Sequence, residues 1–149
     1  MYGTLFSPRN RESILTRVSA LTPESPRLWG SLTVGRAVVH MADQLRMALG
    51  EIKASAPSGP LRFPALRYFA IHVMPWPRGR IKSPGDAFKT APGELAADVG
   101  QLKALIERFG SLSPDAQWPP HAMFGQLSGR DWGVLAYRHL NHHLTQFSA

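Results

Sequence analysis

The sequence predicts an all-α fold, an antiparallel four-helix bundle with a long crossover connection between its second and third helices. Four stretches carry apolar residues at helical spacing, and a proline-rich segment separates the second stretch from the third. No pair of stretches alternates as paired strands do. With 149 residues the chain is long enough for one well-formed core, so we expect a single domain over residues 1–149.

The first two helices are predicted from their caps and apolar stripes. The first begins at Ser7-Pro8, because serine can cap free backbone N–H groups and proline has no N–H to leave unpaired at the first helical position. The second is expected from near Thr33 to about Lys53. The apolar positions are Ile14, Val18 and Leu21 in the first helix, and Val34, Val38, Met41, Leu45 and Ala48 in the second.

The last two helices follow the same logic. The third is expected after Pro92 and ends at Gly110, and the fourth begins at Ser128, with Asp131 three residues later as a variant of the capping box. The apolar positions are Leu95, Val99, Leu102, Ile106 and Phe109 in the third helix, and Leu135, Ala136, Leu140, Leu144 and Phe147 in the fourth.

The connection over residues 55–93 is predicted to be a crossover rather than a turn. It holds seven of the 13 prolines, with a short helix expected at "ALRYFAIHV". It also carries six basic residues against Asp86 alone, which accounts for most of the net charge of +7. No helix has basic residues along one face, so we expect no nucleic acid partner. The basic connection favours an anionic or carboxylate-bearing small molecule, with a solvated basic loop as the alternative.

Composition excludes several classes of protein. The chain has no cysteine, which rules out disulfides and thiolate ligands and fits a cytoplasmic location. No apolar run approaches the ~20 residues that span a bilayer, so no membrane association is expected. The start, "MYGTLFSPRNRES", lacks the basic and apolar regions of a signal peptide. The oligomeric state stays open, with a homodimer among the alternatives.

Three of the six histidines crowd the fourth helix, in "HLNHHLTQF". His139 and His143 are one turn apart, about 40° around the helix axis, so both rings can address one point on the core side. His142 lies roughly 60° from His139 in the opposite sense. Neutral imidazole is the commonest metal ligand, so the pair suggests half of a metal site. A polar patch on a terminal helix is the alternative.

His40 offers a third ligand. It lies mid-way along the second helix, at the border of the apolar stripe. A lone histidine in this place is commonly a hydrogen-bonded core residue, but helix bundles also build metal sites from side chains that project inward from facing helices. Three histidines with an open position are the ligand pattern of catalytic zinc sites.

Two segments resemble a known family. "HLNHHLTQF" resembles the H-x-x-H-H-x-x-Q signature in the last helix of the DinB-like (YfiT-like) metal-binding superfamily, and "LWGSLTVGRAVVHMADQLRMALGE" resembles its second helix. The passage "HAMFGQLSGRDWGVLAYRHLNHHLTQF" is most similar to an uncharacterised branch. The resemblance implies a four-helix bundle in which His40, His139 and His143 hold one divalent metal, most often zinc or nickel.

The resemblance also implies a range of reactions. Some relatives transfer low-molecular-weight thiols such as bacillithiol or mycothiol, and others are isomerases or proposed hydrolases. Many thiol transferases of the family have Arg-Gly-Gln after the last histidine, whereas this chain has Leu144, Thr145 and Gln146. The resemblance therefore supports the metal site more strongly than the thiol reaction.

Other polar residues have weaker assignments. Gln44, His121, His142 and Gln146 are candidates for a supporting or substrate-facing role. Gln44 and Gln146 could orient ligands or bound water, His121 is either a loop cap or a substrate contact, and His142 is expected to be partly exposed. Asp43 is expected to face solvent, and His72 to be structural. The four tryptophans are expected to pack the bundle or to line the mouth of a pocket.

Three hypotheses about function remain. The first is a metal-dependent enzyme, a thiol transferase or hydrolase that acts on a small electrophilic substrate. The second is a non-catalytic metal-binding or ligand-sensing protein. The third is a basic four-helix module that binds nucleic acid or another partner, with histidines as incidental polar residues. No general base can be named from the sequence, which favours either chemistry in which the nucleophile is itself bound to the metal or a protein that binds without turnover.

Overall fold

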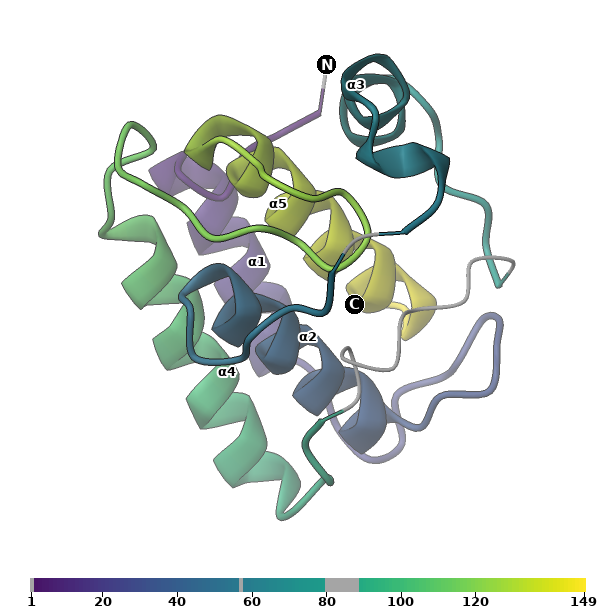
Figure 1. Cartoon of the computed structure of the whole chain (residues 1–149). Coiled ribbons are helices and arrows are strands. Elements are labelled where there is room, and N and C mark those ends of the chain that lie inside the picture. The colour runs from purple at the N-terminus through teal and green to yellow at the C-terminus, as the bar shows by residue number, and fades with distance from the viewer. Residues whose placement is uncertain (1, 57, 80–88) are drawn as a thin grey trace.

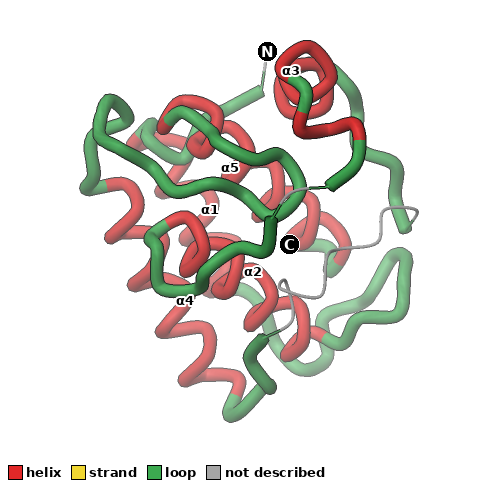
Figure 2. The backbone as a smooth tube through the Cα atoms, viewed as in Figure 1, coloured by secondary structure: helices red, strands yellow, loops and turns green. Residues whose placement is uncertain are grey.

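Helices account for the regular structure in the computed structural model, which describes residues 2–56, 58–79 and 89–149. The helices are α1 (Pro8–Ser19), α2 (Val34–Ala48), the short 3₁₀ helix η1 (Pro60–Arg62), α3 (Pro64–His72), α4 (Leu95–Gly110) and α5 (Gly129–Gln146). The described ranges contain no strand, only an isolated bridge between His121 and Gly125 (Figure 2). The all-α prediction is confirmed, and α3 is the short helix expected in the crossover.

Three of the four predicted helix starts are formed by side-chain caps, and α4 begins without one. Ser7, Thr33 and Ser128 each accept a hydrogen bond from the backbone N–H three residues further on. The predicted end of α2 is wrong, because the helix stops at Ala48 rather than near Lys53. Gly50 follows with a φ of 79°, a left-handed conformation that glycine adopts without strain and that ends the helix.

The four long helices form a bundle in which α2 packs between α4 and α5, and α1 packs against the same two helices (Figure 1). In α4, Gln101 contacts Arg46 of α2, and Arg108 contacts Glu51 just beyond α2. Contacts therefore advance in the same order along both helices, so α2 and α4 run parallel. Parallel neighbours cannot be joined by a tight turn, which explains the long crossover between them.

The pair α2 and α5 runs antiparallel. Trp29, which precedes α2, accepts a hydrogen bond from Gln146 at the end of α5, whereas Gln44, far along α2, contacts His121 ahead of α5. The expectation that the second and last long helices lie side by side is confirmed. The middle of α2 thereby faces the C-terminal half of α5, where the histidines are.

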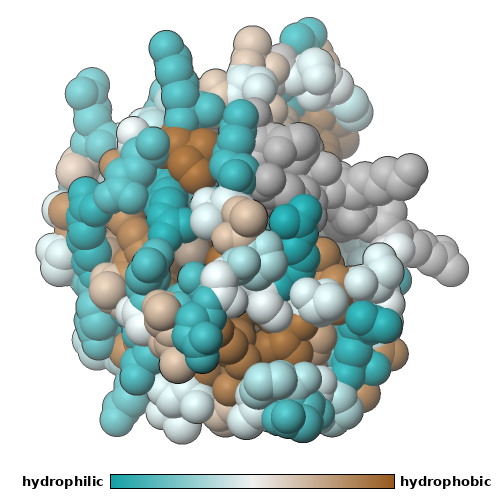
Figure 3. All heavy atoms as spheres, turned by 90° about the horizontal axis from the view of Figure 1, so that it is seen from below, coloured by the Kyte–Doolittle hydropathy of each residue, from teal (hydrophilic) through white to brown (hydrophobic). Residues whose placement is uncertain are grey.

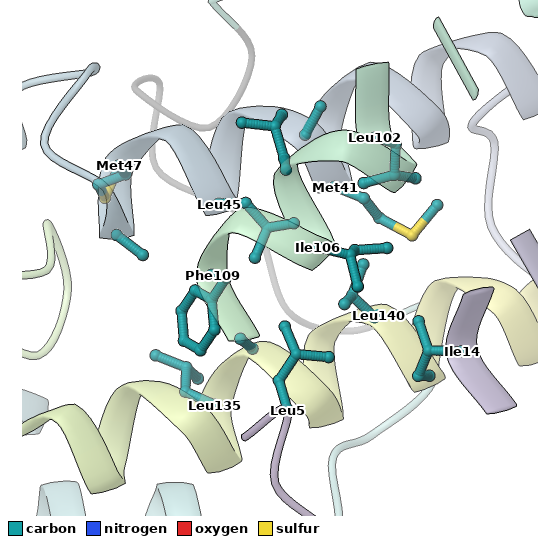
Figure 4. Packing of buried hydrophobic residues seen from close by; sticks show 14 of the residues in the cluster. Leu5, Ile14, Met41, Leu45, Met47, Leu102, Ile106, Phe109, Leu135 and Leu140 are labelled. Carbon is teal, nitrogen blue, oxygen red and sulfur yellow. The ribbon is translucent and has the colours of Figure 1, made fainter. Parts of the chain in front are cut away.

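The core lies where the four long helices meet. Leu45 of α2, Ile106 and Phe109 of α4, and Leu140 of α5 are all buried and converge in Figure 4. Burial of such side chains contributes about 1.5–3 kcal/mol each. Seen from below, polar residues cover much of the surface and apolar residues show in small patches (Figure 3). None of the described helices is long and apolar enough to span a membrane.

Asp43 is buried, so the expectation that it faces solvent is wrong. Its side chain is 0% exposed, because the end of the crossover returns over this face of α2. The carboxylate accepts hydrogen bonds from the backbone N–H of Thr90 at 2.8 Å, from the Thr90 hydroxyl at 2.6 Å and from Arg46 at 2.9 Å. Asp43 thus fastens the crossover to α2. Three of the charged residues in the crossover, Arg80, Lys82 and Asp86, lie outside the described residues.

Candidate metal centre

His40 from α2 and His139 and His143 from α5 form a three-histidine cluster. One nitrogen of each ring lies within 4.8 Å of the others, and the Nε2 atoms of His40 and His139 are 2.8 Å apart. The ring centroid of His40 lies 4.6 Å from that of His139 and 4.8 Å from that of His143. The one-turn spacing on α5 and the antiparallel packing of α2 bring together the three side chains that the sequence predicts as ligands.

Burial keeps the α5 rings of the cluster neutral. It lowers the pKa of His143 to about 3, and the neighbouring His40 ring adds to the effect. Burial, reinforced by His40 and then by His143, also lowers the pKa of His139 well below its usual value. A neutral imidazole has one nitrogen lone pair free to bind a metal ion, so both rings are in the form that a ligand requires.

Gln146 fixes the orientation of the His143 ring. Its side-chain oxygen accepts a hydrogen bond from Nδ1 of His143 at 2.9 Å, and its nitrogen donates to the Trp29 carbonyl at 2.9 Å. The first bond places the proton of neutral His143 on Nδ1 and leaves Nε2 free to bind an ion. Gly30 makes room for this contact, because a Cβ atom there would lie 2.8 Å from the Gln146 nitrogen.

The donor set fits a divalent ion. Nitrogen ligands of tetrahedral zinc lie about 3.4 Å apart, since Zn–N bonds are about 2.0–2.1 Å long. Nε2 of His40 and Nε2 of His139 are 2.8 Å apart, and no two of the candidate ligand nitrogens are more than 4.8 Å apart. Nδ1 of His139 is also buried and has no hydrogen-bond partner among the described residues. Because Nε2 of His139 is the nitrogen that faces His40, an ion in the cluster would leave Nδ1 without a partner, and this unpaired buried nitrogen is a cost of the site.

Comparison with known families identifies the chain. Residues 10–149 match a family described as a protein of unknown function, DUF1569. The chain belongs to this family. All three histidines of the cluster fall within the matched range. Neither curated proteins nor solved structures gave a match.

In this DUF1569 chain the three-histidine cluster borders an apolar pocket of about 730 Å³. Most of its apolar lining comes from the segment before α2, from the crossover and from the loop before α5, and α5 adds Leu135. The residues from the three segments include Trp29, Leu32, Leu61, Ala70, Met74, Trp76, Met123 and Phe124. The pocket is large enough for an organic molecule, because ligand pockets typically span about 300–1,000 Å³. Crossover residues thus form one wall of the site.

His121 is both a loop cap and a pocket residue. Its Nδ1 atom accepts hydrogen bonds from the backbone N–H groups of Met123 at 2.9 Å and Phe124 at 3.4 Å, and Nε2 lies 3.1 Å from the Gln44 amide. Burial lowers its pKa to about 4. Because Nδ1 is an acceptor, the proton of the neutral ring is on Nε2, where the structure places the Gln44 nitrogen; the amide of Gln44 is therefore assigned turned over, so that its oxygen accepts this proton. Gln44 therefore supports His121 and not His40.

His142 lies beside the cluster, outside the set of three. Its ring centroid is 5.2 Å from that of His143, and it is half-buried, as expected. Trp29 and Trp76 contact its ring at centroid distances of 5.4 Å and 6.3 Å, and all three residues line the pocket. Burial lowers its pKa, with a further contribution from Arg78. His142 is thus a pocket imidazole rather than an additional member of the cluster.

The four tryptophans have both of the roles expected from the sequence, pocket lining and core packing. Trp29 and Trp76 line the pocket, whereas Trp118 and Trp132 are buried in the core. His72 is structural, since its Nε2 atom lies 2.7 Å from a carboxylate oxygen of Asp131 and joins α3 to α5.

Arg138 is a supporting residue that the sequence did not single out. Its buried guanidinium donates to the carbonyls of Ala70 at 3.0 Å, Ile71 at 2.7 Å and Met74. These carbonyls lie at the end of α3, where a cation is favourable. The signal that could have marked it is its one-turn spacing from His142, which puts both residues on the same flank of α5.

Proposed function

We propose that this chain is a metal-dependent enzyme, a thiol transferase or hydrolase, that acts on a small electrophilic substrate with one divalent ion on His40, His139 and His143. The observation that carries the proposal is the convergence of three imidazole rings at the border of an apolar pocket. The sequence resemblance to DinB-like metal-binding proteins supports the same function and ligand set.

A divalent ion bound there would lower the pKa of a water molecule or thiol that it coordinates, and would so supply a nucleophile near neutral pH. The residues of the chain provide the surroundings. Gln146 orients His143, and the apolar walls around Trp29 and Trp76 exclude bulk water and hold the body of the substrate. No Asp or Glu is among the described pocket residues, so proton transfer would fall to His142 or His121, the two imidazoles that line the pocket outside the cluster.

Zinc or nickel is the ion that we propose for this site. Imidazole nitrogen suits both, whereas calcium and magnesium prefer oxygen ligands that the three-histidine cluster does not offer. Elemental analysis of the purified protein identifies the ion. The proposal expects close to one equivalent of zinc or nickel per chain.

The reaction is tested with a generic electrophile and two nucleophiles. Metal-loaded protein is incubated with 1-chloro-2,4-dinitrobenzene and a low-molecular-weight thiol, and separately with p-nitrophenyl acetate in water. Thiol transfer accelerates the first reaction, and hydrolysis accelerates the second. Either rate should return to background in His40→Ala. A rate that is equal with and without metal would contradict the proposal.

A second function remains a candidate, namely ligand binding without turnover. It is favoured by the lack of a carboxylate among the described residues that line the pocket, since many metal-dependent hydrolases use one as a base. Metal-dependent binding of a thiol, with no product in either assay, would support this alternative. Salt-sensitive binding of duplex DNA by the metal-free protein would instead favour the basic partner-binding module.

A further inference from the structure

A second, smaller groove of about 340 Å³ lies beside the apolar pocket. Trp29, Trp76 and His142 line both, so these three side chains form a common wall. We call this second feature the polar groove. One side of it is a stripe on α5 at the spacing i, i+3, i+4 and i+7, made of Arg138, Asn141, His142 and Thr145.

Two side chains of this stripe, Asn141 and Thr145, keep a hydrogen-bond donor that no described residue uses, whereas Arg138 already donates to the carbonyls at the end of α3. Arg17 of α1 donates to the side-chain oxygen of Asn141 at 2.7 Å and to the Thr145 hydroxyl oxygen at 3.2 Å. Both acceptor atoms therefore already have a partner. The Asn141 amide nitrogen has none among the described residues, and the Thr145 hydroxyl keeps its proton to donate.

The charge around the groove is positive. Arg138 is buried, with its guanidinium 3.7 Å from the Tyr2 ring centroid and 4.5 Å from that of Trp76. Arg78 lies 4.7 Å from the Trp29 ring centroid at the exposed edge. Within the described part of the chain, no Asp or Glu side chain lines the groove or pairs with either arginine. The field is therefore not cancelled locally and attracts anions.

We propose that the polar groove binds an oxyanion, the carboxylate or phosphate group of a small organic molecule. The unused donors of Asn141 and Thr145, two cations and the lack of an acidic side chain among the described lining residues match an oxyanion, whose oxygens accept and do not donate. Because the groove shares a wall with the apolar pocket, it selects substrates whose apolar body carries such a group. This selection of substrates rests on the proposed function, whereas the binding of an oxyanion in the groove is independent of it.

The binding test uses metal-loaded protein and three probes of similar size: 3-phenylpropionate, phenyl phosphate and neutral 3-phenylpropionamide. Titration calorimetry at low ionic strength should give tighter binding of at least one anion than of the amide, by about tenfold or more, and salt should reduce the difference. The tighter anion identifies the oxyanion class. Equal binding of all three probes would overturn the proposal.

Two variants and a control locate the site. Asn141→Asp keeps an oxygen for Arg17 but replaces the donor with a carboxylate, so the preference for the anion should disappear. Arg78→Gln should reduce the preference for the anion several-fold. Arg9→Gln removes the same charge from an exposed residue of α1 and should leave this preference unchanged. If Arg9→Gln and Arg78→Gln lost the preference for the anion equally, the preference would come from the overall charge of the protein. This result would contradict a site in the groove.

Metal content and turnover are measured in the same samples, so that the two proposals fail separately. Metal-dependent turnover without any preference for anions would refute the groove and leave the enzyme. A preference for anions that Asn141→Asp abolishes, in protein that never binds metal, would leave the groove and refute the metal-dependent function.

Discussion

His143 and Gln146 lie one turn apart on α5, and the side-chain oxygen of Gln146 accepts a hydrogen bond from Nδ1 of His143 at 2.9 Å. The other end of the same amide donates to the Trp29 carbonyl, so the amide cannot turn without losing a bond. The His143 ring is therefore held with Nε2 free. Hydrogen bonds of this kind set both the orientation and the basicity of a metal-binding histidine.

Replacement of Gln146 should weaken metal binding without removing a ligand. In Gln146→Ala we expect metal affinity to fall about 10–100-fold, because the His143 ring loses its orienting partner. Gln146→Glu keeps an acceptor for Nδ1 and should stay closer to the wild type. Gln101→Ala, on the exposed face of α4, is the control. Competition against a chromophoric chelator measures the affinity, and an unchanged value in Gln146→Ala would argue against this role.

Asp43 should contribute to stability and not to metal binding. Asp43→Ala removes the acceptor for both hydrogen bonds from Thr90 and leaves buried donors unpaired, so unfolding in urea should show a loss of about 1–3 kcal/mol. Metal content should remain at the wild-type level. Asp115→Ala, whose side chain is 76% exposed, should change neither quantity. Loss of metal at unchanged stability would instead place Asp43 in the metal site.

His121 should make the stability of the metal-free protein depend on pH. Its folded pKa of about 4 lies below the unfolded value of ~6.5, so the unfolded chain binds the proton first as pH falls. The contribution is complete above pH ~6.5 and is lost as pH falls toward about 4, on the order of 3 kcal/mol.

The matched variant for this effect is His121→Asn, which keeps an acceptor near the position of Nδ1 for the N–H groups of Met123 and Phe124. Its urea unfolding free energy should vary less between pH 6.5 and pH 4 than that of the wild type. Identical pH profiles for both proteins would rule out His121 as the source.

The sequence predicts those features that depend on short-range spacing. Caps at Ser7, Thr33 and Ser128 mark three helix starts, and the apolar stripe of α2 is buried as expected. Helical periodicity also separates His139 and His143 from His142, because a ring's direction around a helix follows from its position along the chain. These local rules suffice to propose the three ligands.

Features that depend on distant segments could not be predicted in this way. Asp43 is buried because Thr90 returns to it across the crossover, and no pattern near residue 43 encodes that contact. Gln44 pairs with His121 for the same reason, since a loop far along the chain brings that ring to α2. The free donors of the polar groove could not be predicted either, because they depend on the hydrogen bonds that Arg17 of α1 donates to Asn141 and Thr145 of α5.

The most direct test of the metal site is the metal content of single alanine variants, measured by plasma mass spectrometry after reconstitution with zinc or nickel. His40→Ala, His139→Ala and His143→Ala should each lose most of the bound ion, because two imidazoles remain of three. His142→Ala, the adjacent control outside the cluster, should keep close to one equivalent. Full retention of metal by His139→Ala, or an equal loss in all four variants, would contradict this ligand set.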